Sequence, residues 1–232
     1  MDHLELYGAP RAWLWLTLGA ITLAVPALIR GFLRRGTGWR YEKRFAIQRA
    51  PQLAIGVTLF LVSAAFEVIE FVLGTGEPAF GKRVFEAWHS VLPLLSLAIV
   101  ASPLLAGTVS WVGVILSGVG LMFLVSGWYA LGSAFSPDAE VLHAQELRQR
   151  GPFRLVMHPV YSGVVQFLFG SAVTTLSPVC ALATVGMVAP LLLRRARYEE
   201  QLLTEEFGAV YLEYAERMGW RRLVPKIIPV GA

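Results

Sequence analysis

The chain has 232 residues, of which 56% are hydrophobic and 16% charged, and its formal net charge is +4. This apolar excess lies above the average of soluble globular domains and indicates a membrane protein. Cys180 is the single cysteine, which excludes an internal disulfide and a cluster of thiolate metal ligands.

Several apolar runs are long enough to cross a bilayer, because a spanning helix needs about 20 mostly apolar residues. We expect such helices at residues 12–32, 51–73, 86–105 and 108–131. The run 160–193 is too long for one crossing, and Ser177-Pro178 breaks it near its middle, so it predicts a helical hairpin. The first run lacks a preceding basic region and is interpreted as a mature helix, not a signal peptide.

The predicted fold class is therefore an all-α integral membrane protein. It has five or six transmembrane helices, including a C-terminal helical hairpin, and then an amphipathic surface helix. Residues 1–107 hold the N-terminal transmembrane helices and carry no motif that we can assign. Residues 108–232 form the second part, with a transmembrane helix, a cofactor loop at 132–159, the hairpin 160–193 and a C-terminal helix at 194–217.

Basic residues leave two arrangements in the membrane open. The segment 30–49 is rich in arginine and lysine, which the positive-inside rule assigns to the cytoplasm. Two later segments, 148–154 and 194–197, are also basic, and the hairpin keeps them on one side. Three full crossings between the segment 30–49 and the two later basic segments would place them on opposite sides of the membrane. Hence either one of the runs 51–73 and 86–105 does not cross fully, or the first basic loop faces away from the cytoplasm.

The cofactor loop ends in the sequence GPFRLVMHPVYSG, residues 151–163. Pro159 suits the first position of a helix, because its fixed φ is helical and its missing N–H would have had no partner there. The N–H groups of the following first turn, with the helix dipole, form a site for a carboxylate or phosphate. His158 lies just before this helix and is expected to face the same pocket. The alternative is a simple turn into the helix, with Arg154 reaching the membrane interface.

A second charged motif follows the hairpin directly. Arg195 and Glu199 are four residues apart, and Arg197 and Glu200 are three apart, so each pair shares a helix face. One interpretation is a set of solvated ion pairs, each worth a few tenths of a kcal/mol. The other is a cofactor pocket, since these charges follow a hairpin whose other end is the His-Pro motif.

The helix that carries these charges is predicted to be amphipathic, because Leu203, Phe207, Val210 and Tyr214 recur at helical spacing. A hairpin returns the chain to the surface that it left. We therefore expect the charged motif to lie beside His158 and Tyr161.

The two motifs at this separation, followed by GWRRLVPKIIP, resemble the isoprenylcysteine carboxyl methyltransferase family and its bacterial relatives, which are also related to phospholipid methyltransferases. Phe153 stands where the family usually has tyrosine, and Met157 replaces the arginine before His-Pro. The resemblance covers about residues 125–229 and is carried by Gly151, His158, Pro159, Tyr161, Gly163, Glu199, Glu200, Leu203, Phe207, Gly208, Tyr211 and Tyr214.

This resemblance implies an S-adenosylmethionine-dependent methyltransferase, multi-pass in the cell membrane, with its active site at the cytoplasmic face. The cofactor-binding residues that it implies are Gly151, His158, Pro159, Tyr161, Glu199 and Glu200. Arg195 and Arg197 are candidate catalytic residues that orient an anionic head group, and His158 either holds the cofactor or accepts a proton.

The expected substrate is a lipophilic or lipid-linked molecule from the bilayer, and its acceptor atom, in a carboxyl, thiol or amine group, stays open. Membrane lipids are expected partners, and nucleic acid is not. Two other functions remain: a membrane NADPH-dependent reductase of the steroid-reductase type, against which Val160 argues, and a non-catalytic membrane protein.

Four polar residues of the N-terminal part stand apart from both motifs. They are Glu67, Glu70, Glu86 and His89, for which we predict no metal site.

Overall fold

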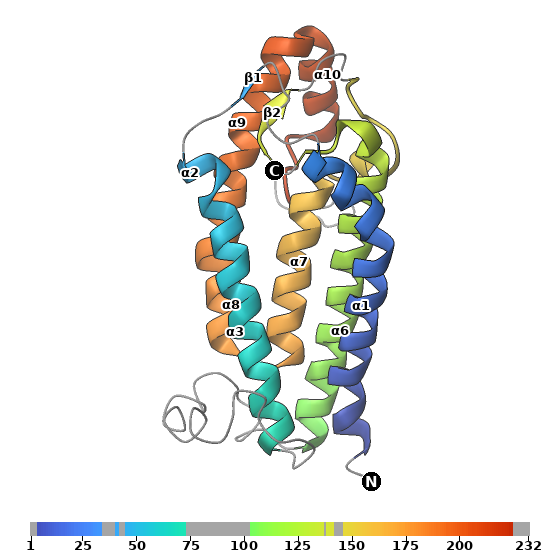
Figure 1. Cartoon of the computed structure of the whole chain (residues 1–232), viewed down its shortest axis with the longest axis vertical. Helices are drawn as coiled ribbons and strands as arrows, with labels where there is room; N and C mark the ends of the chain where they lie inside the picture. Colours follow the sequence, from blue (N-terminus) through green and yellow to red (C-terminus); the bar gives the residue numbers. More distant parts are fainter. Residues whose placement is uncertain are drawn as a thin grey trace.

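The computed structural model describes residues 4–33, 40–41, 45–72, 103–136, 138–141 and 146–224. Long helices run side by side along the longest axis of the molecule (Figure 1). They are α1 (Leu4–Leu33), α3 (Ala50–Val72), α6 (Pro103–Leu131), α7 (Pro159–Thr174) and α9 (Ala189–Phe207), with the short α8 (Pro178–Ala183) preceding α9.

Short elements complete the described part of the chain. They are β1 (Arg40–Tyr41), α2 (Phe45–Gln48), η2 (Gly132–Ala134), β2 (Glu140–Val141), η3 (Gly151–Arg154), η4 (Thr184–Val188) and α10 (Ala209–Met218). The strands pair antiparallel over two residues each, and the rest is almost wholly helical, which confirms the predicted all-α class. β1, β2 and α10 lie at the upper end in Figure 1, opposite the N-terminal end of α1.

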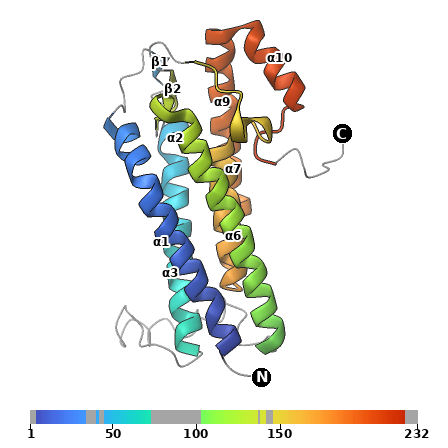
Figure 2. The same ribbon diagram turned by 90° about the vertical axis from the view of Figure 1, so that its right-hand side faces the viewer.

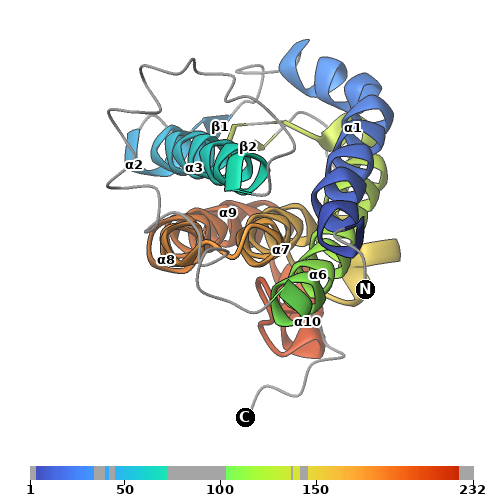
Figure 3. The ribbon, with the colours of Figure 1, turned by 90° about the horizontal axis from the view of Figure 1, so that it is seen from below.

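Helix α7 lies at the centre of the bundle. It contacts α1, α3, α6 and α8, and the view along the bundle shows these helices around it (Figure 3). Buried Leu168 of α7 packs in one apolar cluster with Ala54 of α3, Val188 of η4 and Leu192 of α9. Because α7 begins at Pro159, this packing fixes the position of the His-Pro turn at the upper end.

Glycines allow α6 and α7 to approach closely. Gly113, Gly120 and Gly127 recur every seven residues on α6, and Gly163 and Gly170 do so on α7. A Cβ added at Gly120 would lie under 3.0 Å from backbone atoms of α7. Small residues of this kind are the usual means by which membrane helices pack backbone to backbone.

The predicted hairpin is present. α7 ends at Thr174, Ser177 caps α8 by accepting a hydrogen bond from the N–H of Cys180 at 3.3 Å, and Pro178 is the first residue of α8. The second arm passes through the π-helical turn η4 before α9. This wider turn accommodates Pro190, which has no N–H and whose ring would collide with a carbonyl one turn earlier in a regular helix.

The C-terminal boundaries differ from the predicted ones. We expected a separate helix at 194–217, but α9 continues from the hairpin to Phe207 without a break. The chain bends instead at Gly208, whose φ of +53° suits glycine because a Cβ would be strained there. The charged motif therefore belongs to the upper end of the second hairpin arm, and α10 is a separate helix.

Two described helical stretches are long and apolar enough to cross a membrane, Gly107–Leu131 and Pro178–Phe207. Shorter apolar stretches occur at Ala12–Pro26 and Ala50–Ala65. Large apolar side chains on α1 and α3 are exposed, among them Trp15 at 73%, and such surfaces are typical of contact with lipid.

The number of crossings stays a prediction. The run 86–105 lies outside the described residues apart from its last three, and so do Glu86 and His89. Nothing can be added for Glu67 and Glu70, whose side chains are also outside the described part.

The basic segment near residue 40 lies at the same end of the bundle as the cofactor loop. Arg40 pairs with Val141 and Tyr41 with Glu140. Helices α1 and α6 both end there, and α3 and α7 begin there (Figures 1 and 2). This arrangement matches the first alternative given above, in which one of the runs 51–73 and 86–105 does not cross fully and the basic segments share one side of the membrane.

A labelling experiment tests this sidedness. Arg40→Cys and Arg148→Cys, each introduced into a Cys180→Ser background, should react with a membrane-impermeant thiol reagent from the same side of sealed vesicles, because the strand pairing holds both segments at one end. Labelling of the two variants from opposite sides would contradict the described arrangement.

Close packing of α6 and α7 gives a prediction for stability. Gly120→Ala should destabilise the protein by about 1–3 kcal/mol or more, because the added methyl group meets rigid backbone of α7. Gly56→Ala on α3 is the matched control, since a Cβ there meets nothing within 4 Å and alanine favours a helix. Thermal unfolding in detergent compares the two, and equal stability of both variants would refute the close contact.

Candidate active site

A cavity of about 140 Å³ lies at the upper end of the bundle, where described residues between α6 and α7 meet the start of α7 and the C-terminal half of α9. Aromatic side chains form part of its wall: Phe135, Phe153, Tyr161, Tyr211 and Tyr214. Four carboxylates also line it, namely Asp138, Glu140, Glu146 and Glu199. Arg148 is the one arginine or lysine among the described lining residues.

His158 lies between the two glutamates of α9. Its Nε2 is 3.2 Å from Oε1 of Glu200, and its Nδ1 is 3.8 Å from Oε2 of Glu199. The imidazole is 8% exposed and stacks on the ring of Tyr161, with 5.5 Å between ring centroids. The turn before α7 and the charged end of α9 therefore meet, as the hairpin argument required.

Of the two adjacent glutamates of α9, Glu199 is the one that lines the cavity. The hydroxyl of Tyr161 donates to its Oε1, and Nε of Arg195 donates to the same oxygen at 3.0 Å. The Arg195 guanidinium also lies over the Tyr161 ring, 5.7 Å from its centroid. Arg195 is 4% exposed, so the pair with Glu199 is a buried and well-defined contact rather than a solvated one.

Glu200 lies behind His158, away from the cavity lining, and is only 5% exposed. Its cationic partner is Arg222, whose Nε and Nη2 both donate to Oε2, at 3.0 and 2.7 Å. A buried carboxylate needs such a partner, because an uncompensated buried charge costs several kcal/mol.

The segment Arg221–Leu223 is held along the His-Pro turn by three hydrogen bonds. The N–H of Met157 donates to the Arg221 carbonyl at 2.8 Å, and the N–H of His158 donates to the Arg222 carbonyl at 3.2 Å. The hydroxyl of Ser162 donates to the Leu223 carbonyl at 2.6 Å. Arg222 was not predicted from the sequence, although its place in the closing GWRRLVP motif was a signal for it.

The remaining predicted residues divide into two groups. Pro159 is the first residue of α7 and lines the cavity, as expected. Arg197 is exposed on α9 and does not line the cavity, because it lies two residues from buried Arg195 and so faces another side of the helix. Gly151 begins η3 with a φ of +63°, is exposed, and does not line the cavity either.

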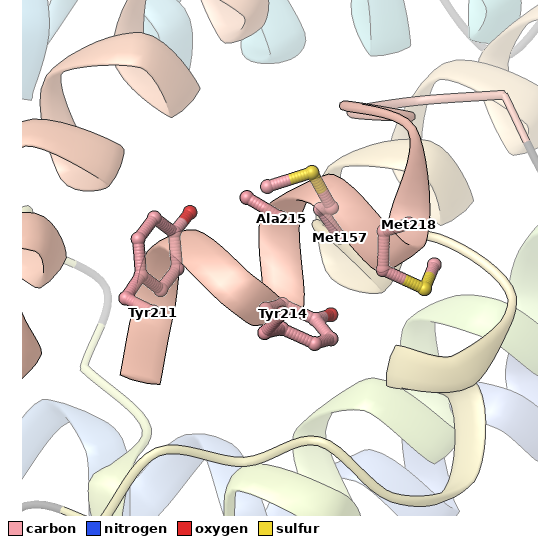
Figure 4. Close-up of a cluster of buried hydrophobic side chains, with 5 residues drawn as sticks. All are labelled: Met157, Tyr211, Tyr214, Ala215 and Met218. Atoms are coloured by element: carbon pink, nitrogen blue, oxygen red, sulfur yellow. The ribbon is translucent and has the colours of Figure 1, made fainter. Parts of the chain in front are cut away.

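Helix α10 covers the His-Pro turn through an apolar cluster. Met157, Tyr211, Tyr214, Ala215 and Met218 pack together (Figure 4). Met157 therefore fills an apolar place against α10, where the family pattern has an arginine. Burial raises the pKa of both tyrosines, so their hydroxyls stay protonated, and that of Tyr214 donates to the Phe153 carbonyl at 2.8 Å.

The fold and the cavity together define a class: a helical protein with membrane-spanning candidates and a charged, partly aromatic cavity at one end of its bundle. Comparison with known proteins narrows this class further. Residues 108–210 match the model of the phospholipid methyltransferase family.

Curated relatives point the same way. Protein-S-isoprenylcysteine O-methyltransferase A of Arabidopsis thaliana is 33% identical over 110 residues, which are 47% of this chain and 56% of the relative. Form B of the same plant is 34% identical over 73 residues, 32% of this chain and 37% of the relative. A probable protein-S-isoprenylcysteine O-methyltransferase of Oryza sativa is 28% identical over 112 residues, 47% of this chain and 59% of the relative.

These matches bear out, over the segment that they cover, the predicted resemblance to the isoprenylcysteine and phospholipid methyltransferases. The chain spans between 37% and 59% of the length of these relatives. The family and the two candidate membrane helices also support a location in a membrane.

The contact between Tyr214 and Phe153 gives a prediction for stability. Tyr214→Phe should lower the free energy of unfolding by about 1–3 kcal/mol, because it leaves the Phe153 carbonyl without this buried donor. Tyr211→Phe is the matched control, since it removes a hydroxyl with no hydrogen-bond partner among the described residues. Chemical denaturation should separate the two variants, and an equal loss in both would remove the role of this hydrogen bond.

Proposed function

We propose that the protein is an integral-membrane, S-adenosylmethionine-dependent methyltransferase that acts on a lipophilic substrate. The observation that carries the proposal is the contact of His158 with both glutamates of α9 beside an acidic and aromatic cavity. This cavity is built largely from the segment that matches the phospholipid methyltransferase family.

The residues present fit this cofactor. S-adenosylmethionine supplies an electrophilic methyl group on a sulfonium, and it also carries an ammonium, a carboxylate and an adenosine group. The four carboxylates of the lining suit its two cationic centres. The rings of Phe153 and Tyr161 suit the adenine and can face the sulfonium through cation–π attraction.

Several polar residues at the cavity then have a task. Glu199 accepts a hydrogen bond from the amine or the ribose, and Arg195 and Tyr161 hold its carboxylate in place. The N–H groups at the start of α7 suit the cofactor carboxylate, since a helix N-terminus favours anions. Arg195 thus acts through Glu199 and does not face the substrate, and exposed Arg197 is left without a task in the cavity.

His158 is a further polar group of the lining that can move a proton. Glu200 holds its ring from behind, and Arg222 compensates the charge of Glu200. Methyl transfer is an in-line displacement that requires a nucleophile near attack distance and the exclusion of water. We infer that His158 either orients the cofactor or accepts the proton of a thiol or amine acceptor, and that α10 with its apolar cluster keeps water out.

The substrate class follows from the surroundings of the cavity. The relatives that the protein matches are named for isoprenylcysteine. Exposed apolar side chains cover the helices of the bundle below the cavity. We propose that a lipid-linked or lipophilic acceptor enters from the bilayer and presents a carboxyl, thiol or amine group at the cytoplasmic face of a multi-pass protein. Membrane lipids surround the bundle in this arrangement.

The reductase alternative fits less well. NADPH carries several phosphate charges, whereas the described lining has four carboxylates and a single arginine. Carboxylates beside phosphates repel each other, so this wall favours a cationic over a polyanionic cofactor.

Binding of S-adenosylmethionine tests the proposal. In detergent, wild-type protein should bind the methyl-labelled cofactor, and Glu199→Gln should weaken binding about tenfold to a hundredfold, because one charged hydrogen bond is worth about 1.5–3 kcal/mol. Glu206→Gln is the matched control: it is exposed on the same helix and does not line the cavity. Wild-type protein that binds labelled NADPH but not S-adenosylmethionine would overturn the proposal, and a labelled product from a membrane lipid extract would identify the acceptor.

A further inference from the structure

One wall of the cavity is held by residues that lie outside the segment of the family match. The segment Ser136–Val141 contributes Ser136, Asp138 and Glu140 to the lining. It is held from outside by Gln48 and Arg49, which lie more than fifty residues before the matched segment 108–210.

Gln48 binds this segment with both ends of its side-chain amide. Its Nε2 donates to the Ala139 carbonyl at 3.1 Å, and the N–H of Ala139 donates to its Oε1 at 2.8 Å. Gln48 is 2% exposed and Ala139 is 1% exposed. The two hydrogen bonds satisfy both the N–H and the carbonyl of buried Ala139, so the position of Ala139 depends on this glutamine.

Arg49 binds the neighbouring residue. Its Nη1 lies 3.1 Å from Oδ1 of Asp138, whose side chain is 1% exposed. The backbone N–H of Asp138 donates to the Ser136 hydroxyl at 3.2 Å, and that hydroxyl donates in turn to Glu140. The charge of Asp138 and the orientation of the two other polar lining residues are thus connected to Arg49.

Further contacts hold the same corner. β1 pairs with β2, and α2 and β2 both contact α9, the helix that carries Glu199. The N-terminal part therefore contacts two separate walls of the cavity, the segment Ser136–Val141 and helix α9.

We propose that Gln48 and Arg49 are positioning residues for the cofactor cavity, and that residues 1–107 thereby complete a site whose chemical groups lie in the second half of the chain. Gln48 fixes the backbone at Ala139, and Arg49 compensates the Asp138 carboxylate. The identity of the ligand rests on the proposed function, whereas the positioning of the wall does not.

Paired variants of the full chain in detergent test this. Gln48→Leu removes both hydrogen bonds at nearly constant volume, and Arg49→Gln removes the charge beside Asp138. Gln201→Leu and Arg194→Gln are matched controls, because both residues are exposed on α9 and neither lines the cavity. Arg49→Lys is the conservative variant that keeps the positive charge.

Two measurements are made on each variant. Amide hydrogen exchange of residues 138–141 should become faster in Gln48→Leu and Arg49→Gln and stay unchanged in the controls. The Kd for S-adenosylmethionine should rise about tenfold in the same two variants, the value expected for the loss of one or two net hydrogen bonds. Turnover should show a higher KM for the cofactor with kcat within about threefold, and Arg49→Lys should restore most of the affinity.

The outcomes separate the two proposals. Unchanged exchange in both variants, or faster exchange with unchanged Kd, would overturn the positioning role. If Gln48→Leu does not fold, Arg49→Gln and Arg49→Lys carry the same test. If wild-type protein does not bind S-adenosylmethionine, the proposed function fails, and amide exchange alone then decides whether Gln48 and Arg49 hold the wall.

Discussion

Two adjacent carboxylates in α9, of which Glu200 is buried and Glu199 half-buried, are the constraint on which the arrangement of the cavity depends. Glu199 and Glu200 leave the helix on different sides, and each needs its own cation because neither charge is stable alone in a poorly solvated place. Arg195 supplies one from the same helix, four residues earlier, and Arg222 supplies the other from a distant part of the chain. His158 contacts both carboxylates, so the helix end, the His-Pro turn and the segment after α10 must come together.

The bundle below makes that meeting possible. Glycines on the facing sides of α6 and α7 allow the two backbones to touch, which fixes the height of Pro159 and with it that of His158. The break at Ser177 and the π-helical turn before Pro190 then return the chain to the same end. This packing is compatible with a membrane, where the hydrophobic effect does not drive helices together. Small residues there allow close van der Waals contact between helices.

Function is divided unevenly along the chain. The matched segment 108–210 supplies most of the cavity lining and Glu199, while Arg222 follows it. Gln48 and Arg49 precede it and hold a wall of the same cavity. The cavity in the matched segment is thus contacted by residues from both flanks, and these contacts lie outside the segment that the family match covers.

The sequence by itself determined the elements whose signals are local. Apolar length predicted the spanning candidates, Ser177-Pro178 predicted the hairpin, and Pro159 predicted the start of α7. Hairpin geometry was enough to place His158, Tyr161 and Glu199 together. Only the tertiary structure decided that α9 continues through residue 193 to Phe207 and that Arg197 faces away from the cavity. It also showed that Arg222 binds Glu200, and that Gln48 and Arg49 bind Ala139 and Asp138. Whether a helix continues past a change from apolar to polar residues depends on the packing around it. Contacts between residues 22 or 89 positions apart do not produce a periodic pattern in the sequence that could predict them.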